Sequence, residues 1–185
     1  MPVIGIISRL VKHKGIDLII NAIEGIQKEK VQFIILGKGD RGYELYFKYL
    51  QESYHDKIYV KIGFDSSFAK KIYAGSDLFL MPSISEPCGI AQMISSRYGA
   101  VPIVRETGGL RDSIKDASLG EGNGFTFSDQ TPEALCDAVK RALKVYENKE
   151  DWKRLVETVM NTDFSWKKSA EKYFYMYSSL ADIGE

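Results

Sequence analysis

Val31-Gln32-Phe33-Ile34-Ile35-Leu36-Gly37 is an apolar run that ends at a glycine. A run of this kind, rich in β-branched and aromatic residues, predicts a strand that is buried on both faces of a sheet. Similar runs recur at Val3–Ile7, Ile58–Ile62, Leu78–Met81, Val101–Val104 and, in shorter form, Gly124–Phe127. Between them, apolar residues recur at helical spacing, as at Ile16, Ile19 and Ile23. This alternation predicts an α/β domain with one parallel sheet of about six strands and helices on both faces.

The last part of the chain carries helical patterns only. Thr131 followed by Pro132 predicts a helix start, because a hydroxyl can accept from a free amide and proline suits the first turn. Two more helices are predicted after this one, and the last places Tyr173, Phe174 and Tyr177 on one face. We expect these three rings to pack within the domain or, alternatively, against a separate domain.

Composition excludes several classes of protein. The 185 residues suit a single domain, and 44% apolar residues are enough for a core. Twenty-five basic and twenty-five acidic residues cancel, so the charge balance does not favour nucleic-acid binding. No apolar run approaches the roughly 18 residues of a membrane span, and the first residues are too short for a signal peptide. With only Cys88, Cys136 and two histidines, a disulfide framework or a metal site is not expected. We therefore expect a cytoplasmic protein without nucleic-acid or membrane partners.

Gly37-Lys38-Gly39-Asp40-Arg41-Gly42 has the G-x-G-x-x-G spacing of a dinucleotide-binding loop, and Asp56 lies near the distance downstream at which such folds bind ribose. The pattern raises one alternative, an NAD-binding Rossmann domain. It follows the second predicted strand, however, whereas a dinucleotide loop normally follows the first. We therefore favour glycines that allow a tight turn from strand to helix.

A cationic loop follows the first predicted strand. Arg9, Lys12, His13 and Lys14 crowd the start of a helix whose amino terminus already carries positive partial charge. An anion at this place would relieve the conflict, and a phosphate is the usual one. The alternative is a solvated basic loop that binds nothing.

Two more loops are expected at the same edge of the sheet. Glu86 follows the fourth predicted strand, where its carboxylate could bind sugar hydroxyls or simply cap a helix. Thr107-Gly108-Gly109 follows the fifth strand, where paired glycines let amides approach a ligand or only form a turn. Ligands bind outside the carboxyl ends of parallel strands. The sequence thus predicts an anion site, a carboxylate and an amide nest close together.

Three long runs carry a resemblance to a known family: Ser8–Leu18, Pro82–Gln92 and Arg97–Leu110. In these runs the chain resembles bacterial glycogen synthases and plant starch synthases, which are retaining glycosyltransferases of the two-domain GT-B fold. The resemblance covers nearly the whole chain but only the C-terminal, nucleotide-sugar-binding domain of that family. It implies a Rossmann-like, doubly wound parallel sheet over residues 1–185. It also implies that an N-terminal domain, which carries most of the α-glucan acceptor site, is missing, so that the chain is a piece of a longer protein.

The resemblance assigns roles to individual residues. Arg9 and Lys14 are expected to bind the donor diphosphate, and Glu86 to hold the glucose hydroxyls near the reacting carbon. Phe64 stands where the family stacks a tyrosine on adenine. The other expected substrate-binding residues surround glucose and phosphates, chiefly through backbone amides: Cys88, Gly89, Ile90, Ala91, Thr107, Gly108 and Gly109. The implied donor is ADP-glucose, with UDP-glucose as the alternative, and no cofactor or metal is implied.

Some positions depart from the family pattern. Ile94 lies eight residues after Glu86, where many retaining relatives have a second glutamate. Phe64 keeps the ring face of the usual tyrosine but drops its hydroxyl. Neither change affects the charged residues Arg9, Lys14 and Glu86.

We expect the chain alone to bind its donor without transferring glucose. A nucleotide-binding regulatory module without catalytic activity remains the main alternative, ahead of the NAD-binding domain.

Overall fold

The computed structural model describes residues 1–181. Its centre is a six-stranded parallel sheet in the order β3-β2-β1-β4-β5-β6. The strands are β1 (Val3–Leu10), β2 (Gln32–Gly39), β3 (Ile58–Ile62), β4 (Leu78–Met81), β5 (Val101–Arg105) and β6 (Phe125–Phe127). The prediction of one parallel sheet with about six strands is confirmed.

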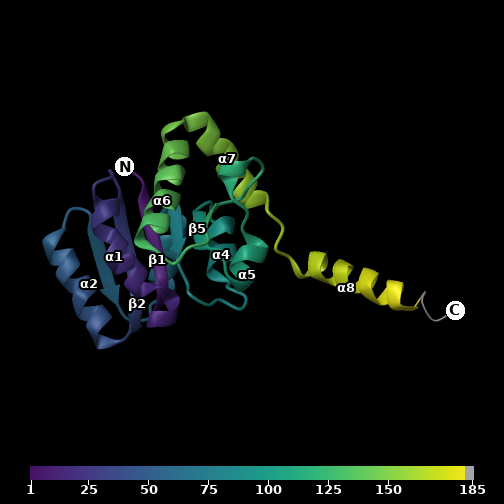
Figure 1. Cartoon of the computed structure of the whole chain (residues 1–185), viewed down its shortest axis with the longest axis horizontal. Coiled ribbons are helices and arrows are strands. Elements are labelled where there is room, and N and C mark those ends of the chain that lie inside the picture. The colour runs from purple at the N-terminus through teal and green to yellow at the C-terminus, as the bar shows by residue number, and fades with distance from the viewer. Residues whose placement is uncertain (182–185) are drawn as a thin grey trace.

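Helices cover both faces of this sheet (Figure 1). They are α1 (Ile16–Gln27), α2 (Arg41–Ser53), α3 (Ser66–Gly75), α4 (Ala91–Arg97), α5 (Gly108–Ser113), α6 (Pro132–Glu147), α7 (Lys149–Asn161) and α8 (Trp166–Ala181), with short 3-10 turns η1 (Lys12–Lys14) and η2 (Ala117–Leu119). Side chains alternate along a strand, so Ile4 and Ile6 join the large core with α1, α2 and α6. Ile7 joins a smaller core with α3 and α4 on the other face. The fold is therefore doubly wound, as expected.

The strand order reverses between β1 and β4. The chain runs outward from β1 to β3, returns to place β4 beside β1, and then continues to β6. At such a switch point the loops that leave the two central strands diverge and open a crevice, which is the usual ligand site of this architecture. Arg9 lies at the carboxyl end of β1, and Lys14 and Glu86 follow β1 and β4, so the fold brings the expected catalytic residues to this crevice.

The helix α8 extends away from the body of the chain (Figure 1). Tyr173, Phe174 and Tyr177 are 57%, 68% and 63% exposed, and Trp166 at the start of the helix is 88% exposed. The prediction that these rings pack within the domain is therefore wrong. Helical spacing indicated which residues share a face, but it carried no information about what that face contacts.

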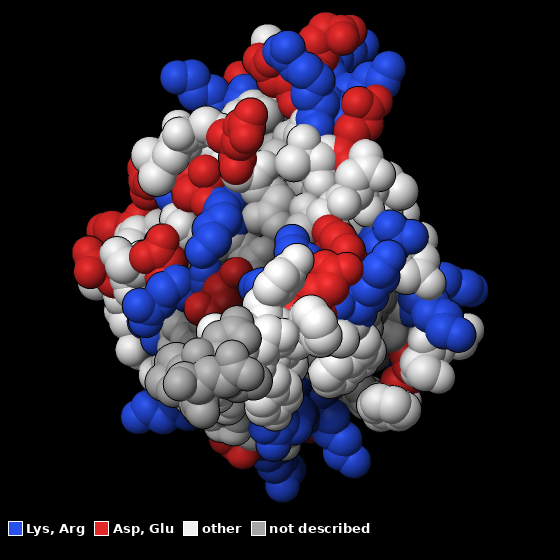
Figure 2. Space-filling model, turned by 90° about the vertical axis from the view of Figure 1, so that its right-hand side faces the viewer, with Lys and Arg blue, Asp and Glu red and all other residues white. Residues whose placement is uncertain are grey.

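Basic and acidic side chains are interspersed on the face that Figure 2 shows, and no large area carries a single sign of charge. Among residues 1–181, none of the helices combines the length and apolar composition that crossing a membrane requires.

One partly buried ionic contact joins β6 and the segment before it to α6. The Arg141 guanidinium donates from Nη1 to Asp116 Oδ2 at 2.6 Å and from Nη2 to the Thr126 carbonyl at 2.7 Å. Burial raises the pKa of the Asp116 carboxyl, but the Thr126 amide and Arg141 lower it by more, so the pKa lies below its usual value. The ionised carboxylate is thus a stabilising part of the fold.

We predict that Asp116→Asn lowers the free energy of unfolding at pH 7 by about 1–3 kcal/mol, because an amide cannot neutralise Arg141. A carboxyl whose pKa is lowered by folding adds stability that is present above the unfolded pKa, about 3.9, and is lost as the pH falls through the folded value. The difference between the two chains should therefore shrink below about pH 4. Urea unfolding of both chains at pH 7 and pH 3 measures this difference in the free energy of unfolding. The same difference at both pH values would contradict a stabilising role of the ionised Asp116 carboxylate.

Candidate active site

Two loops meet at the switch point because a glycine allows them to. Gly15 ends η1 with φ +72 and precedes α1. A Cβ added there would lie 2.0 Å from the Pro82 carbonyl oxygen, so only a glycine lets the two backbones come this close. The His13 carbonyl then accepts from the Ile84 amide at 2.9 Å. The loop after β1 and the loop after β4 are thereby joined by a backbone hydrogen bond.

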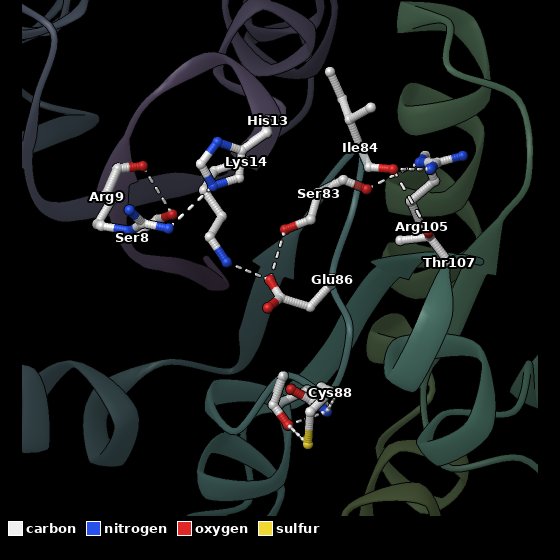
Figure 3. Close-up of polar contacts among 12 residues, drawn as sticks. Ser8, Arg9, His13, Lys14, Ser83, Ile84, Glu86, Cys88, Arg105 and Thr107 are labelled. Atoms are coloured by element: carbon white, nitrogen blue, oxygen red, sulfur yellow. Dashed lines mark hydrogen bonds and ion pairs between the residues drawn. The ribbon is translucent and has the colours of Figure 1, made fainter.

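This junction places Lys14 against Glu86 (Figure 3). Lys14 Nζ donates to Glu86 Oε2 at 2.5 Å, and Ser83 Oγ donates to the same oxygen at 3.1 Å. Glu86 is 8% exposed and Ser83 is 2% exposed. A buried carboxylate is costly unless it is paired and hydrogen-bonded, and here both conditions hold. The contact between Lys14 and Glu86 was not predicted, since each had been assigned to a different part of the donor.

Arg9 lies beside this ion pair at the exposed end of β1. Its Nη2 lies 3.0 Å from His13 Nε2, which orients the guanidinium toward the cationic loop. Arg9, Lys14 and Glu86 together line a cavity of about 240 Å³. The same cavity is bounded by Gly89, Ile90 and Ala91 at the start of α4. The structure therefore gathers the three expected catalytic residues and this part of the expected amide loop around one space.

Arg9 also lines a second and larger cavity of about 780 Å³. Phe64 is at its edge and is 94% exposed, an unusual state for a phenylalanine ring. Tyr73 and Tyr98 contribute to its wall as a stacked pair with centroids 6.0 Å apart. Burial raises the pKa of the Tyr73 phenol, which keeps it neutral. The cavity is mainly apolar, with an aromatic ring free to stack on a flat ligand.

The glycine loop after β5 differs from expectation. The Thr107 amide donates to the Arg105 carbonyl at 2.8 Å, and the Gly109 amide donates to the Glu86 carbonyl at 3.1 Å. An amide proton used in this way is not free for a ligand. A Cβ on Gly108 would lie 2.2 Å from the Glu86 carbonyl oxygen. The amides of Thr107 and Gly109 are thus bonded within the protein, and Gly108 packs closely against the Glu86 backbone.

A buried glutamine holds the loop after Glu86. Gln92 is 0% exposed, and its Nε2 lies within hydrogen-bond distance of the carbonyls of Cys88 and Gly89 and of Ser113 Oγ. Its role was missed because the sequence did not show that its amide would turn back toward its own loop.

The Cys88 side chain is exposed and the cysteine is free. Within the described part of the chain, no three His, Cys, Asp or Glu side chains cluster as metal ligands would.

The glycines at positions 37 and 39 belong to β2 and not to a separate phosphate loop. Gly37 pairs with Ser8 and Gly39 with Leu10. A Cβ on Gly39 would lie 2.1 Å from the Leu10 carbonyl oxygen, so the glycines allow β1 and β2 to stay paired up to the edge of the sheet. This packing role supports our preference for a structural explanation over a dinucleotide fingerprint, although the glycines do occur inside the strand and not in a turn.

A sequence model of the family Glycosyl transferases group 1 matches residues 1–157. The chain belongs to this family. Among curated glycosyltransferases, a glycogen synthase from Kosmotoga olearia is 50% identical over 186 residues, which cover 100% of this chain and 39% of the relative. One from Clostridioides difficile is 47% identical and covers 98% of the chain and 38% of the relative. The chain thus spans about two fifths of the length of these relatives.

Solved glycosyltransferase structures agree with this assignment. The catalytic domain of starch synthase IV from Arabidopsis thaliana, bound to ADP and acarbose, has a TM-score of 0.87 and 40% identity, over 96% of this chain and 38% of that one. Sucrose-phosphate synthase from Thermosynechococcus elongatus has a TM-score of 0.69 at 21% identity, over 99% of this chain and 46% of that one. The second match supports the fold alone. The Rossmann-like, GT-B type of domain implied by the sequence is confirmed.

We predict that Gly15→Ala destabilises this glycosyltransferase chain by more than about 2 kcal/mol, because it combines a left-handed backbone with a clash against Pro82. Gly42→Ala is the matched control. A Cβ at Gly42 meets nothing within 4 Å and the residue has no positive φ, so this change should be neutral or slightly stabilising. Thermal unfolding measures the stability of both variants relative to the unchanged chain. Equal losses of stability would refute the close approach of the two loops.

Proposed function

We propose that the chain is the nucleotide-sugar-binding part of a glycogen or starch synthase. In this proposal it binds ADP-glucose for retaining transfer of glucose to the non-reducing end of an α-1,4-glucan. The observation that carries the proposal is Arg9, which lines both the cavity that holds the Lys14–Glu86 pair and the apolar cavity with Phe64. A diphosphate beside Arg9 would connect a base in one cavity with a sugar in the other. The relatives named above support the same conclusion.

The charges of the site suit such a donor. Lys14 has three N–H donors, of which one is used by Glu86, so two can bind phosphate oxygens. Arg9 supplies a planar guanidinium, which suits phosphate groups. Gly89, Ile90 and Ala91 bound the smaller cavity and are proposed to line the glucose. Phe64 is proposed to stack on the base, because an exposed ring offers a face to any flat aromatic ligand.

The proposed chemistry follows from these positions. Transfer breaks the bond between the anomeric carbon and the phosphate oxygen, so negative charge develops on ADP and positive charge on the glucose ring. Arg9 and Lys14 would stabilise the first, and preorganised charge is usually the largest catalytic contribution. The Glu86 carboxylate would stabilise the second. Retention without an evident protein nucleophile favours attack from the face of the leaving group. The acceptor hydroxyl then forms the new bond and gives its proton to a phosphate oxygen of the donor. The proposal needs no additional cofactor.

Two alternatives are distinguished by ligand binding. A regulatory module without catalytic activity would bind nucleotide with no gain from the glucose, and an NAD-binding domain would prefer the dinucleotide. A thermal-shift panel with ADP, ADP-glucose, UDP-glucose and NAD separates these cases, and it also compares the two sugar donors. A cytoplasmic location is part of the proposal, and the free thiols of Cys88 and Cys136 agree with a reducing compartment.

Arg9→Ala and Lys14→Ala should each weaken ADP binding by about 1.5–3 kcal/mol, the range for hydrogen bonds to charged groups. Lys12→Ala is the matched control, because Lys12 belongs to the same loop but is not among the residues that line either cavity. It should have a much smaller effect. Calorimetry with ADP measures all three. Equal losses at the three positions would indicate a diffuse basic surface without a defined phosphate site.

Phe64→Ala should weaken ADP binding by about 1–3 kcal/mol, the range for stacking a base on an aromatic side chain. Phe64→Tyr should retain affinity, because the ring face is kept. Leu119→Ala controls for the loss of an exposed apolar side chain, since Leu119 is 89% exposed and lines neither cavity. If Phe64→Ala binds ADP as well as Leu119→Ala does, the base lies elsewhere.

The 185-residue chain is proposed to bind the donor without elongating glucan. Positioning of the acceptor hydroxyl can account for about 7–11 kcal/mol of a barrier, and it needs a second wall opposite the switch-point crevice. The exposed rings of Tyr173, Phe174 and Tyr177 are proposed to pack on the domain that supplies this wall. Adding the N-terminal domain of a relative, in cis or as a separate chain, should restore transfer. Incorporation of labelled glucose into glycogen by the chain alone, abolished in Glu86→Ala, would refute this.

A further inference from the structure

Arg105 ends β5, next to the loop that carries Glu86, and its guanidinium donates hydrogen bonds to backbone oxygens of that loop (Figure 3). Its Nε donates to the Ser83 carbonyl at 2.9 Å and its Nη2 to the Ile84 carbonyl at 2.5 Å. Nη1 donates to the Ser128 carbonyl, after β6, at 3.3 Å. Thus one guanidinium connects the ends of three neighbouring strands, β4, β5 and β6.

The two carbonyls that Arg105 binds belong to Ser83 and Ile84, whose other polar groups hold Glu86 and the Lys14 loop. Ser83 donates its hydroxyl to Glu86 Oε2 at 3.1 Å, and Ile84 donates its amide to the His13 carbonyl at 2.9 Å. A shift of this short segment would therefore move the hydroxyl that holds Glu86 and loosen the junction with the Lys14 loop. The planar guanidinium matches two successive carbonyls, whereas a lysine offers a single point of charge.

A direct role for Arg105 on the donor is not supported by its position. Three of its five N–H groups already donate to carbonyls, and Arg105 is not among the residues that line the cavity with Glu86 or the cavity with Phe64. We propose that Arg105 is a positioning residue, which fixes the Glu86 carboxylate by holding the Ser83–Ile84 backbone. Its effect on sugar binding rests on the function proposed above, but its effect on the loop does not.

The chain offers a matched control in Arg141. This arginine also donates to a backbone carbonyl, that of Thr126, and to a carboxylate, that of Asp116. Its side chain is 30% exposed, and it lines a different cavity, beside η2 and β6. Replacing Arg105 or Arg141 by methionine removes a guanidinium and its hydrogen bonds in each case, but only the first change reaches the Glu86 loop.

The first measurement is hydrogen exchange of the whole chain without any ligand. Arg105→Met should speed exchange of the amides in residues 83–89 by about tenfold or more, which corresponds to about 1.4 kcal/mol in the opening equilibrium. Arg141→Met should leave this segment unchanged and affect the contact between β6 and α6. Arg105→Lys should restore little of the protection. Equal exchange of the segment in both methionine variants, or full protection in Arg105→Lys, would overturn the proposal.

The second measurement compares the affinities for ADP-glucose and ADP by calorimetry. Arg105→Met should weaken ADP-glucose about tenfold more than ADP, the effect of one hydrogen bond to a charged group. In a Glu86→Gln background the same change should no longer alter this ratio, because its effect passes through Glu86. Equal losses for both ligands, or an unchanged effect in Glu86→Gln, would overturn the role of Arg105. Wild-type chain that binds neither ligand would refute the proposed function, while the exchange experiment still decides whether Arg105 holds the loop.

Discussion

The carboxylate of Glu86 is buried, and this constraint organises the crevice at the switch point. A charge with so little exposure is tolerated only with a cation and a hydrogen-bond donor in place, and Lys14 and Ser83 supply them. Both partners must be held at fixed positions, because each is on a loop that could otherwise move. The close approach at Gly15, the hydrogen bond from Ile84 to His13 and the contact of Gly109 with the Glu86 carbonyl all meet this need.

The same arrangement makes the site closely packed on one side and open on the other. Beneath Glu86, carbonyls and amides are paired with one another, and the glycines allow backbones to pack closely. Above it, Arg9, Phe64 and Ile90 are exposed. Rigid support beneath exposed recognition groups is the arrangement that preorganised binding sites generally require.

Much of this could be predicted from the sequence. The strands were recognisable because both faces of a parallel sheet are buried, which gives apolar runs such as the one before Gly37. Arg9, Lys14 and Glu86 could be placed together because the ends of parallel strands share an edge. The hydrogen bonds of the Thr107 and Gly109 amides could not be predicted from the sequence, because they depend on which carbonyl oxygens the folded chain brings close to them. Arg105 carried one overlooked signal: a charge at the end of a buried strand must find partners nearby.

The projecting helix α8 has a consequence for the behaviour of the chain in solution. It exposes Trp166, Tyr173, Phe174, Tyr175 and Tyr177 together, while the formal net charge of the whole chain is zero. Colloidal repulsion between molecules is weakest when the net charge vanishes, and clustered exposed rings favour association. The exposed rings of α8 therefore favour self-association of this chain near neutral pH. Conditions that move the charge away from zero, or a partner that covers α8, would oppose it.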